Sequence, residues 1–162
     1  MRRWLQTLGI DSRRIRTTVA PSARGSAEAF VITQYPLVVK EFRAKANHQL
    51  GIGMIVVVDA DLRSVEYRCR QLDQSLENAG RPVRAATERI CHLVPKRHIE
   101  TWLRYLLGVD VDEERDIKHD FREVPPDLIR LAGERFGESR RAPQCLLASL
   151  VATIDETRRL GL

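Results

Sequence analysis

Apolar residues recur along the chain with two different periods, and the changes between them predict the order of strands and helices. Residues 53–58 form an uninterrupted apolar run rich in β-branched side chains, and a second apolar segment, RICHLV, follows at about 89–94. Continuous rather than alternating hydrophobicity predicts strands that are covered on both faces, as in a parallel sheet. Residues 14–20 contain a further β-branched run and predict a third strand.

Helical spacing accounts for most of the remaining chain. One apolar stripe follows Ser64, a residue type that caps helices, and the stripe ends before Gly80. Its members are Val65, Cys69, Leu72 and Leu76. Other helices are predicted over residues 1–8, over 26–46, from Ile99 to a stop at Gly108, from 125 onward and over about 143–160. Pro36 lies inside the second of these, which it should kink or divide.

This succession of strands and helices predicts the fold class. Three strands, each followed by a helix, are typical of an α/β protein with a doubly wound, mostly parallel sheet and helices on both faces. After residue 108 the chain is predicted to be helical only. We therefore expect an α/β core over residues 1–108 and a C-terminal helical extension over 109–162 that packs on it, within one domain of 162 residues.

The composition excludes several classes of protein. Hydrophobic residues make up 43% and charged residues 30%, which is typical of a soluble globular chain. No apolar run approaches the roughly 20 residues that span a bilayer, and no secretory segment follows Met1. The three cysteines lack metal-ligand spacing, and Cys69 and Cys91 fall on apolar faces. We expect a cytoplasmic protein that has reduced core thiols and no membrane partner.

The net charge of +5 is concentrated near the start of the chain. Residues 1–25 hold six arginines and one acid, Asp11, which accounts for the whole excess. A basic segment of this kind attracts polyanions, of which DNA or RNA is the commonest. Four of its arginines are candidate phosphate contacts, namely Arg13, Arg14, Arg16 and Arg24. A solvated helix end followed by an edge strand would carry the same charges without any partner.

Two acidic side chains follow the central predicted strand. In an extended segment Asp59 and Asp61 would project to the same side, where ligands bind at the carboxyl ends of parallel strands. Paired hard oxygen ligands suit Mg²⁺ or Mn²⁺. The alternative is structural: Asp61 caps the following helix and Asp59 bonds to loop amides.

The predicted strand at residues 89–94 leads into a second candidate segment, PKRHIETW. Glu100 is a candidate third metal ligand and catalytic residue beside Asp59 and Asp61, although the helix dipole alone could favour an acid there. Lys96 and Arg97 are candidate phosphate contacts. Arg63, directly after the acidic pair, either contacts phosphate or is solvated. His98 is either a catalytic residue or an ordinary residue at the start of the helix.

Other common motifs are missing from the chain. It has no phosphate-binding or dinucleotide-binding glycine pattern and no G-x-S-x-G elbow, which disfavours ATP hydrolysis, NAD-dependent transfer and an α/β-hydrolase. The acidic residues 110–116 lack the order of a calcium loop and predict a solvated turn. A D-x-D pair also occurs in glycosyltransferases, but this chain is short for donor and acceptor sites.

Two segments resemble the Toprim family, the metal-dependent catalytic domain of topoisomerases, primases and overcoming-lysogenization-defect nucleases. They are GMIVVV followed by Asp59-x-Asp61, and VPKRHIETWLRYLLG, which is similar to a stretch of Toprim-like proteins in bacterial defence loci. The resemblance covers roughly residues 1–108. It implies a three-layer, Rossmann-like sheet and phosphodiester chemistry with Mg²⁺ on Asp59 and Asp61, with Glu100 as an extra ligand. It also implies a partner ATPase in anti-phage defence.

One element of the family pattern has no counterpart here. The family's glutamate ends an earlier strand, whereas residues 1–10 resemble the helix after that strand and the first acid is Asp11. Either the true start lies upstream, or the domain has lost this acid/base residue. The two hypotheses are therefore a nuclease or nuclease subunit, and a catalytically silent module that binds nucleic acid or a protein. The strand beside Asp59 would then be missing, which leaves an edge that a helix, a partner or a second copy of the chain would cover.

Overall fold

The structure, a computed structural model, combines helices with a small parallel sheet. It describes residues 2–21, 27–48, 51–115, 124–139 and 147–161. Within these ranges the strands are β1 (Met54–Val57) and β2 (Ile90–Leu93). The helices are α1 (Arg2–Thr7), the short 3-10 helix η1 (Ser12–Arg14), α2 (Ala27–Ala46), α3 (Val65–Asn78), α4 (Ile99–Leu106), α5 (Pro126–Ser139) and α6 (Ala148–Arg158).

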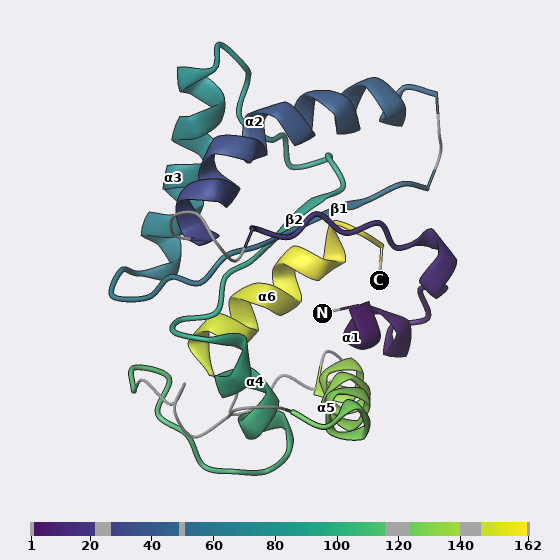
Figure 1. The fold of residues 1–162 in the computed structure, drawn as a ribbon, viewed down its shortest axis with the longest axis vertical. Helices are drawn as coiled ribbons and strands as arrows, with labels where there is room; N and C mark the ends of the chain where they lie inside the picture. Colours follow the sequence, from purple (N-terminus) through teal and green to yellow (C-terminus); the bar gives the residue numbers. More distant parts are fainter. Residues whose placement is uncertain (1, 22–26, 49–50, 116–123, 140–146, 162) are drawn as a thin grey trace.

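The two strands pair in parallel, and α3 forms the crossover between them (Figure 1). The register joins Met54 to Ile90 and Val57 to Leu93. Hydrogen bonding continues beyond the strands, because the Ala60 N–H donates to the Pro95 carbonyl at 2.8 Å. The parallel pairing predicted from the two apolar runs is confirmed, and the chain leaves both strands at the same edge of the sheet.

Residues 14–20 do not form the predicted third strand. Asp11 caps η1 by accepting a hydrogen bond from the Arg13 N–H at 2.8 Å, and residues 15–20 continue without strand pairing. Their side chains find little to pack against, and Val19 is 77% exposed. A β-branched segment gains strand stability mainly from side-chain packing. The expectation of three strands is therefore wrong for the described residues, in which the sheet has two.

Helices cover both faces of the sheet (Figure 1). On one face α2 and α3 pack over a cluster that consists of Tyr35, Val39, Val56, Val58, Ala60, Leu72, Leu76, Ile90 and Val94. On the other face the cluster consists of Trp4, Cys91, Leu93, Trp102, Leu103, Leu106, Ala132, Phe136, Leu150, Ile154 and Leu160. Ile90 enters the first cluster, and Cys91 and Leu93 enter the second, which explains why β2 is buried along its whole length.

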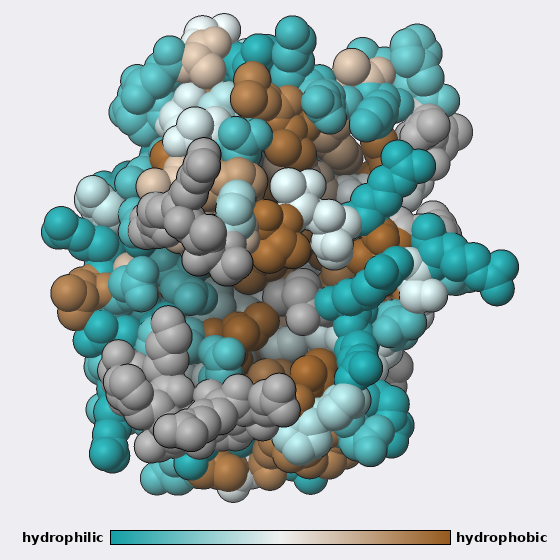
Figure 2. All heavy atoms as spheres, in the orientation of Figure 1, coloured by the Kyte–Doolittle hydropathy of each residue, from teal (hydrophilic) through white to brown (hydrophobic). Residues whose placement is uncertain are grey.

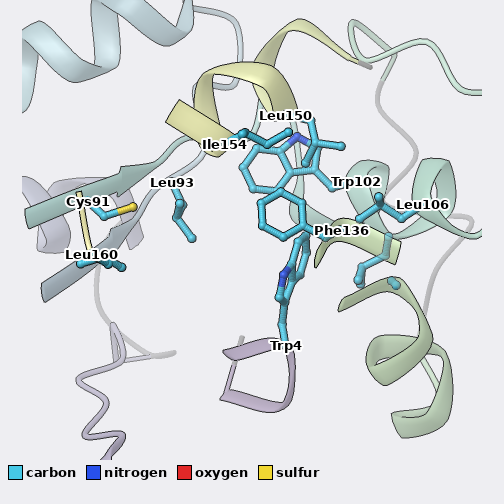
Figure 3. Packing of buried hydrophobic residues seen from close by; sticks show 11 residues of the cluster. Trp4, Cys91, Leu93, Trp102, Leu106, Phe136, Leu150, Ile154 and Leu160 are labelled. Carbon is cyan, nitrogen blue, oxygen red and sulfur yellow. The ribbon is translucent and has the colours of Figure 1, made fainter. Parts of the chain in front are cut away.

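Aromatic side chains join the two ends of the chain in the second cluster. Phe136 of α5 lies between Trp4 and Trp102 (Figure 3). The ring centroid of Trp4 lies 5.2 Å from that of Phe136 and 6.1 Å from that of Trp102, both in edge-to-face arrangements. Leu150 and Ile154 place α6 in the same cluster, so helices that follow residue 108 share a core with α1 and β2.

The longest helix, α2, is not divided at its proline. It runs for 20 residues through Pro36, and its axis changes direction between its ends (Figure 1). α2 carries several charged side chains, among them Lys40 and Arg43. In the described part of the chain, no helix combines the length and the apolar character that crossing a membrane requires.

Candidate functional site

Two turns meet at the carboxyl edge of the sheet, and we call them together the rim (residues 59–64 and 95–100). The hydrogen bond from Ala60 to Pro95 ties one turn to the other. As a result, the Asp59 Oδ2 atom lies 3.9 Å from the His98 Nδ1 atom, at the start of α4. Ligands of open parallel sheets bind at this edge. The structure thus brings the D-x-D segment beside the PKRH segment.

The two aspartates of the rim are accessible, and each lies near a different charged or titratable neighbour. The Asp59 side chain is 41% exposed and the Asp61 side chain 51%. Asp61 adopts a left-handed backbone conformation, with φ of 55°. The expectation that both carboxylates project to one side assumed an extended chain, and this turn is not extended. Asp59 therefore lies near His98, whereas Asp61 Oδ2 lies 4.0 Å from Arg68 Nη2.

The structure does not assemble the three candidate metal ligands into one group. Glu100 lies in the first turn of α4 and is half-buried. Among the described residues, no three His, Cys, Asp or Glu side chains are grouped closely enough to hold a metal ion. A metal at the rim would therefore be bound by Asp59 and Asp61 as they are arranged here, or by a rearranged site that also includes Glu100.

A buried arginine, Arg68, holds the first turn of the rim in place. Its side chain is 2% exposed, and it forms an ion pair with Glu28 of α2. Its Nε donates to the Asp59 carbonyl at 3.0 Å and its Nη2 to the Ala60 carbonyl at 3.4 Å. The hydrogen bond from Arg68 lowers the pKa of the Glu28 carboxyl, which keeps the pair charged.

Sequence reasoning missed this residue, although a signal was present. Arg68 precedes Leu72 and Leu76 by four and eight positions, so it occupies the buried face of α3. An arginine at a core position of an apolar stripe indicates a buried partner, because an unpaired buried guanidinium is costly. A search for charged residues on predicted core faces would have found it.

The candidate cations of the rim are held by neighbouring parts of the chain. Lys96 Nζ lies 3.0 Å from a Glu114 carboxylate oxygen and donates to the Arg63 carbonyl at 3.0 Å. Arg97 Nε donates to the Glu114 carbonyl at 2.9 Å. The Arg63 guanidinium lies over the Tyr67 ring, 5.2 Å from its centroid. The acidic segment that was predicted to be solvated therefore contacts the rim through Glu114.

The structure does not bring the basic N-terminal residues to the rim. Arg13 lies in η1 and Arg16 follows it, and both side chains are exposed. Figure 1 places η1 on the opposite side of the molecule from the turn that follows β1. The side chain of Arg14 and the whole of Arg24 lie outside the described residues. Arg13 and Arg16 thus form a separate basic region.

Comparison with known proteins adds no family to these observations. No family model, curated protein or solved structure matches this chain. The function is therefore argued from the chemistry of the rim itself.

A second polar cluster is buried beside β2. The Tyr35 hydroxyl and the His92 Nε2 atom are 2.9 Å apart, and the two rings pack edge to face. Burial lowers the pKa of His92 to about 3, so the imidazole is neutral at physiological pH. No described residue provides a hydrogen-bond partner for His92 Nδ1. His92 is therefore a buried, hydrogen-bonded residue of β2.

An ion pair, which we call the edge pair (Arg84 and Glu156), covers the outer edge of β2. Arg84 Nη1 donates to the Ile90 carbonyl at 3.0 Å, and Glu156 Oε2 accepts from the His92 N–H at 2.8 Å. Both backbone groups point away from β1. Burial raises the pKa of Glu156, but hydrogen bonds from Arg84 and the His92 N–H outweigh it and leave this pKa lowered. The edge pair thus supplies the bonds that a neighbouring strand would form.

One surface hollow lies away from these clusters. It is found at the C-terminal end of α4, next to α5, and Tyr105, Gly108, Arg135 and Glu138 contribute to its lining. The rim lies at the N-terminal end of α4, so none of the candidate residues lines this hollow.

Proposed function

We propose that this protein performs divalent-metal-dependent phosphodiester chemistry on nucleic acid at the rim, as a nuclease or as a subunit of one. The proposal depends on one observation, the parallel register that places Asp59 Oδ2 within 3.9 Å of His98. Because of this register, exposed carboxylates and a basic turn share one edge of the sheet. The resemblance of residues 53–61 and 94–108 to the Toprim family supports the same chemistry.

The exposed carboxylates of the rim are the type of ligand that Mg²⁺ or Mn²⁺ prefers. Mg²⁺ usually keeps several waters and binds one or two carboxylates together with substrate phosphates. Asp59 and Asp61 are exposed carboxylates of this kind, and Glu100 is close enough in sequence to Lys96 and Arg97 to belong to the same turn. When bound, the ion would polarise a phosphate and stabilise the charge that develops on its oxygens.

The chain itself supplies a rigid support for this chemistry. Arg68 fixes the carbonyls of Asp59 and Ala60 from below, so that the turn keeps its shape without a ligand. Lys96 is anchored on Glu114, and the substrate phosphate would compete for it. A partner ATPase and a role in anti-phage defence are proposed from the resemblance alone.

Cleavage assays with matched variants test the proposal. Supercoiled plasmid, short duplex DNA and single-stranded DNA or RNA are incubated with Mg²⁺, Mn²⁺ or EDTA. We expect cleavage with metal only, and about 100-fold slower cleavage by Asp59→Asn and Asp61→Asn. Asp110→Asn, an exposed acid outside the rim, is the control that should cleave normally. Binding of Mn²⁺, followed by electron paramagnetic resonance, should weaken in the same two variants.

Two results would contradict the proposal. One is the lack of metal-dependent cleavage of all these substrates. The other is equal cleavage by wild type and Asp59→Asn, which would assign the activity to a contaminant or to another site.

The exposed arginines of the N-terminal region favour a second candidate function, a catalytically silent module that binds nucleic acid. Arg13 and Arg16 are exposed, and η1, which contains Arg13, lies away from the rim (Figure 1). Phosphate contacts by such residues give binding that is independent of sequence and sensitive to salt. This candidate predicts that the affinity for nucleic acid falls steeply between about 50 and 200 mM salt. The substitution Asp59→Asn should leave this affinity unchanged. Fluorescence anisotropy measures both, and salt-independent binding would exclude it.

A further inference from the structure

We propose that the rim takes single-stranded nucleic acid, whose unpaired bases stack on a platform formed by Leu62, Arg63, Tyr67 and Arg70. This inference rests on the proposed function, because it assigns the class of nucleic acid that reaches Asp59 and Asp61. It starts from apolar and aromatic side chains that the fold leaves in solvent directly beside the two aspartates.

Leu62 and Tyr67 are large hydrophobic side chains that lie exposed to solvent. Leu62 is 80% exposed and Tyr67 is 42% exposed. In Figure 2 an apolar group projects from a hydrophilic surface at the far left, where Figure 1 draws the turn that follows β1. This turn is held by the buried Arg68 and by a hydrogen bond from the Arg63 N–H to the Ala60 carbonyl at 3.0 Å. Leu62 is therefore presented to solvent by a rigid support.

Two arginines flank the exposed tyrosine ring. The guanidinium of Arg63 lies 5.2 Å from the Tyr67 ring centroid, which is a cation–π distance. Arg70 follows Tyr67 by three positions on α3, so it lies one turn further along the same face, and it is exposed. Glu66 is the acid on this face, and the nearby charges of Arg70 and Lys96 offset it. The result is an exposed aromatic ring with one cation over its face and a second cation one turn away along α3.

This combination suits unpaired bases rather than a duplex. Every base has a π-face that stacks on an aromatic or guanidinium plane, and arginines beside the ring bind the backbone phosphates. In a duplex the base faces are covered by neighbouring pairs, so that a ring on a helix surface has nothing to stack on. Because Leu62 and Arg63 directly follow Asp61, a strand stacked on the platform passes the two aspartates.

Binding measurements in EDTA test the platform separately from catalysis. The probes are fluorescein-labelled oligothymidylate, oligouridylate, a length-matched abasic strand and a duplex, each followed by anisotropy. We expect oligothymidylate to bind about tenfold more tightly than the abasic strand. Tyr67→Ala should lose this preference, and Tyr67→Phe should keep it. Leu37→Ala, an exposed apolar residue on α2, is the matched control that should bind as wild type.

The outcomes separate this inference from the proposed function. Equal affinity for oligothymidylate and the abasic strand, unchanged binding by Tyr67→Ala, or preference for duplex would overturn the platform. Tyr67-dependent binding without metal-dependent cleavage would support the platform and contradict catalysis. Cleavage that depends on Asp59 but not on Tyr67 would support catalysis at the rim and contradict the platform. Because Tyr67 is partly exposed, its variants should keep the wild-type melting temperature, which circular dichroism checks.

Discussion

The molecule has two polar clusters that contain similar residue types in opposite surroundings. The cluster at the outer edge of β2 is buried and includes the edge pair and the Tyr35–His92 contact. The rim is exposed and is supported from below by Arg68. Strongly shifted pKa values often mark functional sites. Here the shifted pKa values of His92 and Glu156 belong to groups that pack against Tyr35 or bind the outer edge of β2, so a shifted pKa alone does not mark a functional site in this molecule.

Loss of the edge pair should give the largest effect on stability. Glu156→Ala leaves the Arg84 charge and the His92 N–H without their partner in a largely buried place. We expect the free energy of unfolding to fall by about 4 kcal/mol. Urea denaturation measures it. Asp155→Ala, the exposed neighbour on α6, should change it by less than about 0.5 kcal/mol, and similar losses in both variants would contradict the role of the edge pair.

The buried histidine should make stability depend on pH. The pKa of His92 is about 3 in the folded protein and about 6.5 in the unfolded chain. The unfolded state therefore binds the proton first, and stability falls as the pH drops from about 6.5 toward 3. This one group should cost about 3 kcal/mol between pH 7 and pH 4. His92→Gln should show a shallower loss over this window, as measured by urea denaturation at several pH values, and an identical pH profile would rule out the assignment.

Arg68 links the buried interior to the rim, and its removal should affect both. Arg68→Met leaves the Glu28 carboxylate and the Asp59 carbonyl without their donor. We expect a loss of about 2 kcal/mol in the free energy of unfolding, together with weaker Mn²⁺ binding at the rim. Arg130→Met, which removes an exposed arginine of α5, should change neither quantity. Normal Mn²⁺ binding by Arg68→Met would show that the turn keeps its shape without this residue.

The left-handed residue of the rim should give the smallest effect. Asp61 has φ of 55°, a conformation that glycine adopts freely and that β-branched residues avoid. Asp61→Gly should stay within about 0.5 kcal/mol of wild type, whereas Asp61→Val should destabilise by about 1 kcal/mol. Thermal denaturation of both variants compares them. Equal stability of the two would indicate that the turn is not left-handed, and both should lose metal binding because the carboxylate is gone.

The sequence was sufficient to predict the central βαβ unit. The apolar runs at 53–58 and 89–94 lie in β1 and β2, and the stripe from Val65 to Leu76 lies in α3. These predictions succeed because burial on both faces of a strand, or on one face of a helix, leaves a direct mark on the spacing of apolar residues. Ser64 also caps α3 as expected, since its side chain accepts from the Tyr67 N–H.

Features that depend on distant contacts could not be predicted in this way. The β-branched run at 14–20 has strand propensity, but pairing requires packing that local sequence does not report. The assumption of an extended chain from Asp59 to Asp61 was wrong, because Asp61 has a left-handed backbone conformation that the local sequence does not report. Arg84 and Glu156 are 72 positions apart, and no periodicity connects them. The rim could be located from the sequence, whereas the direction of its side chains could not.

The edge pair also restricts how molecules of this protein can associate. Arg84 and Glu156 occupy the outward backbone groups of β2, so a strand from another molecule that joins the sheet does so beside β1. Addition of a strand beside β2 would first have to break this ion pair and leave the Arg84 charge without its partner, so this edge of the sheet resists association.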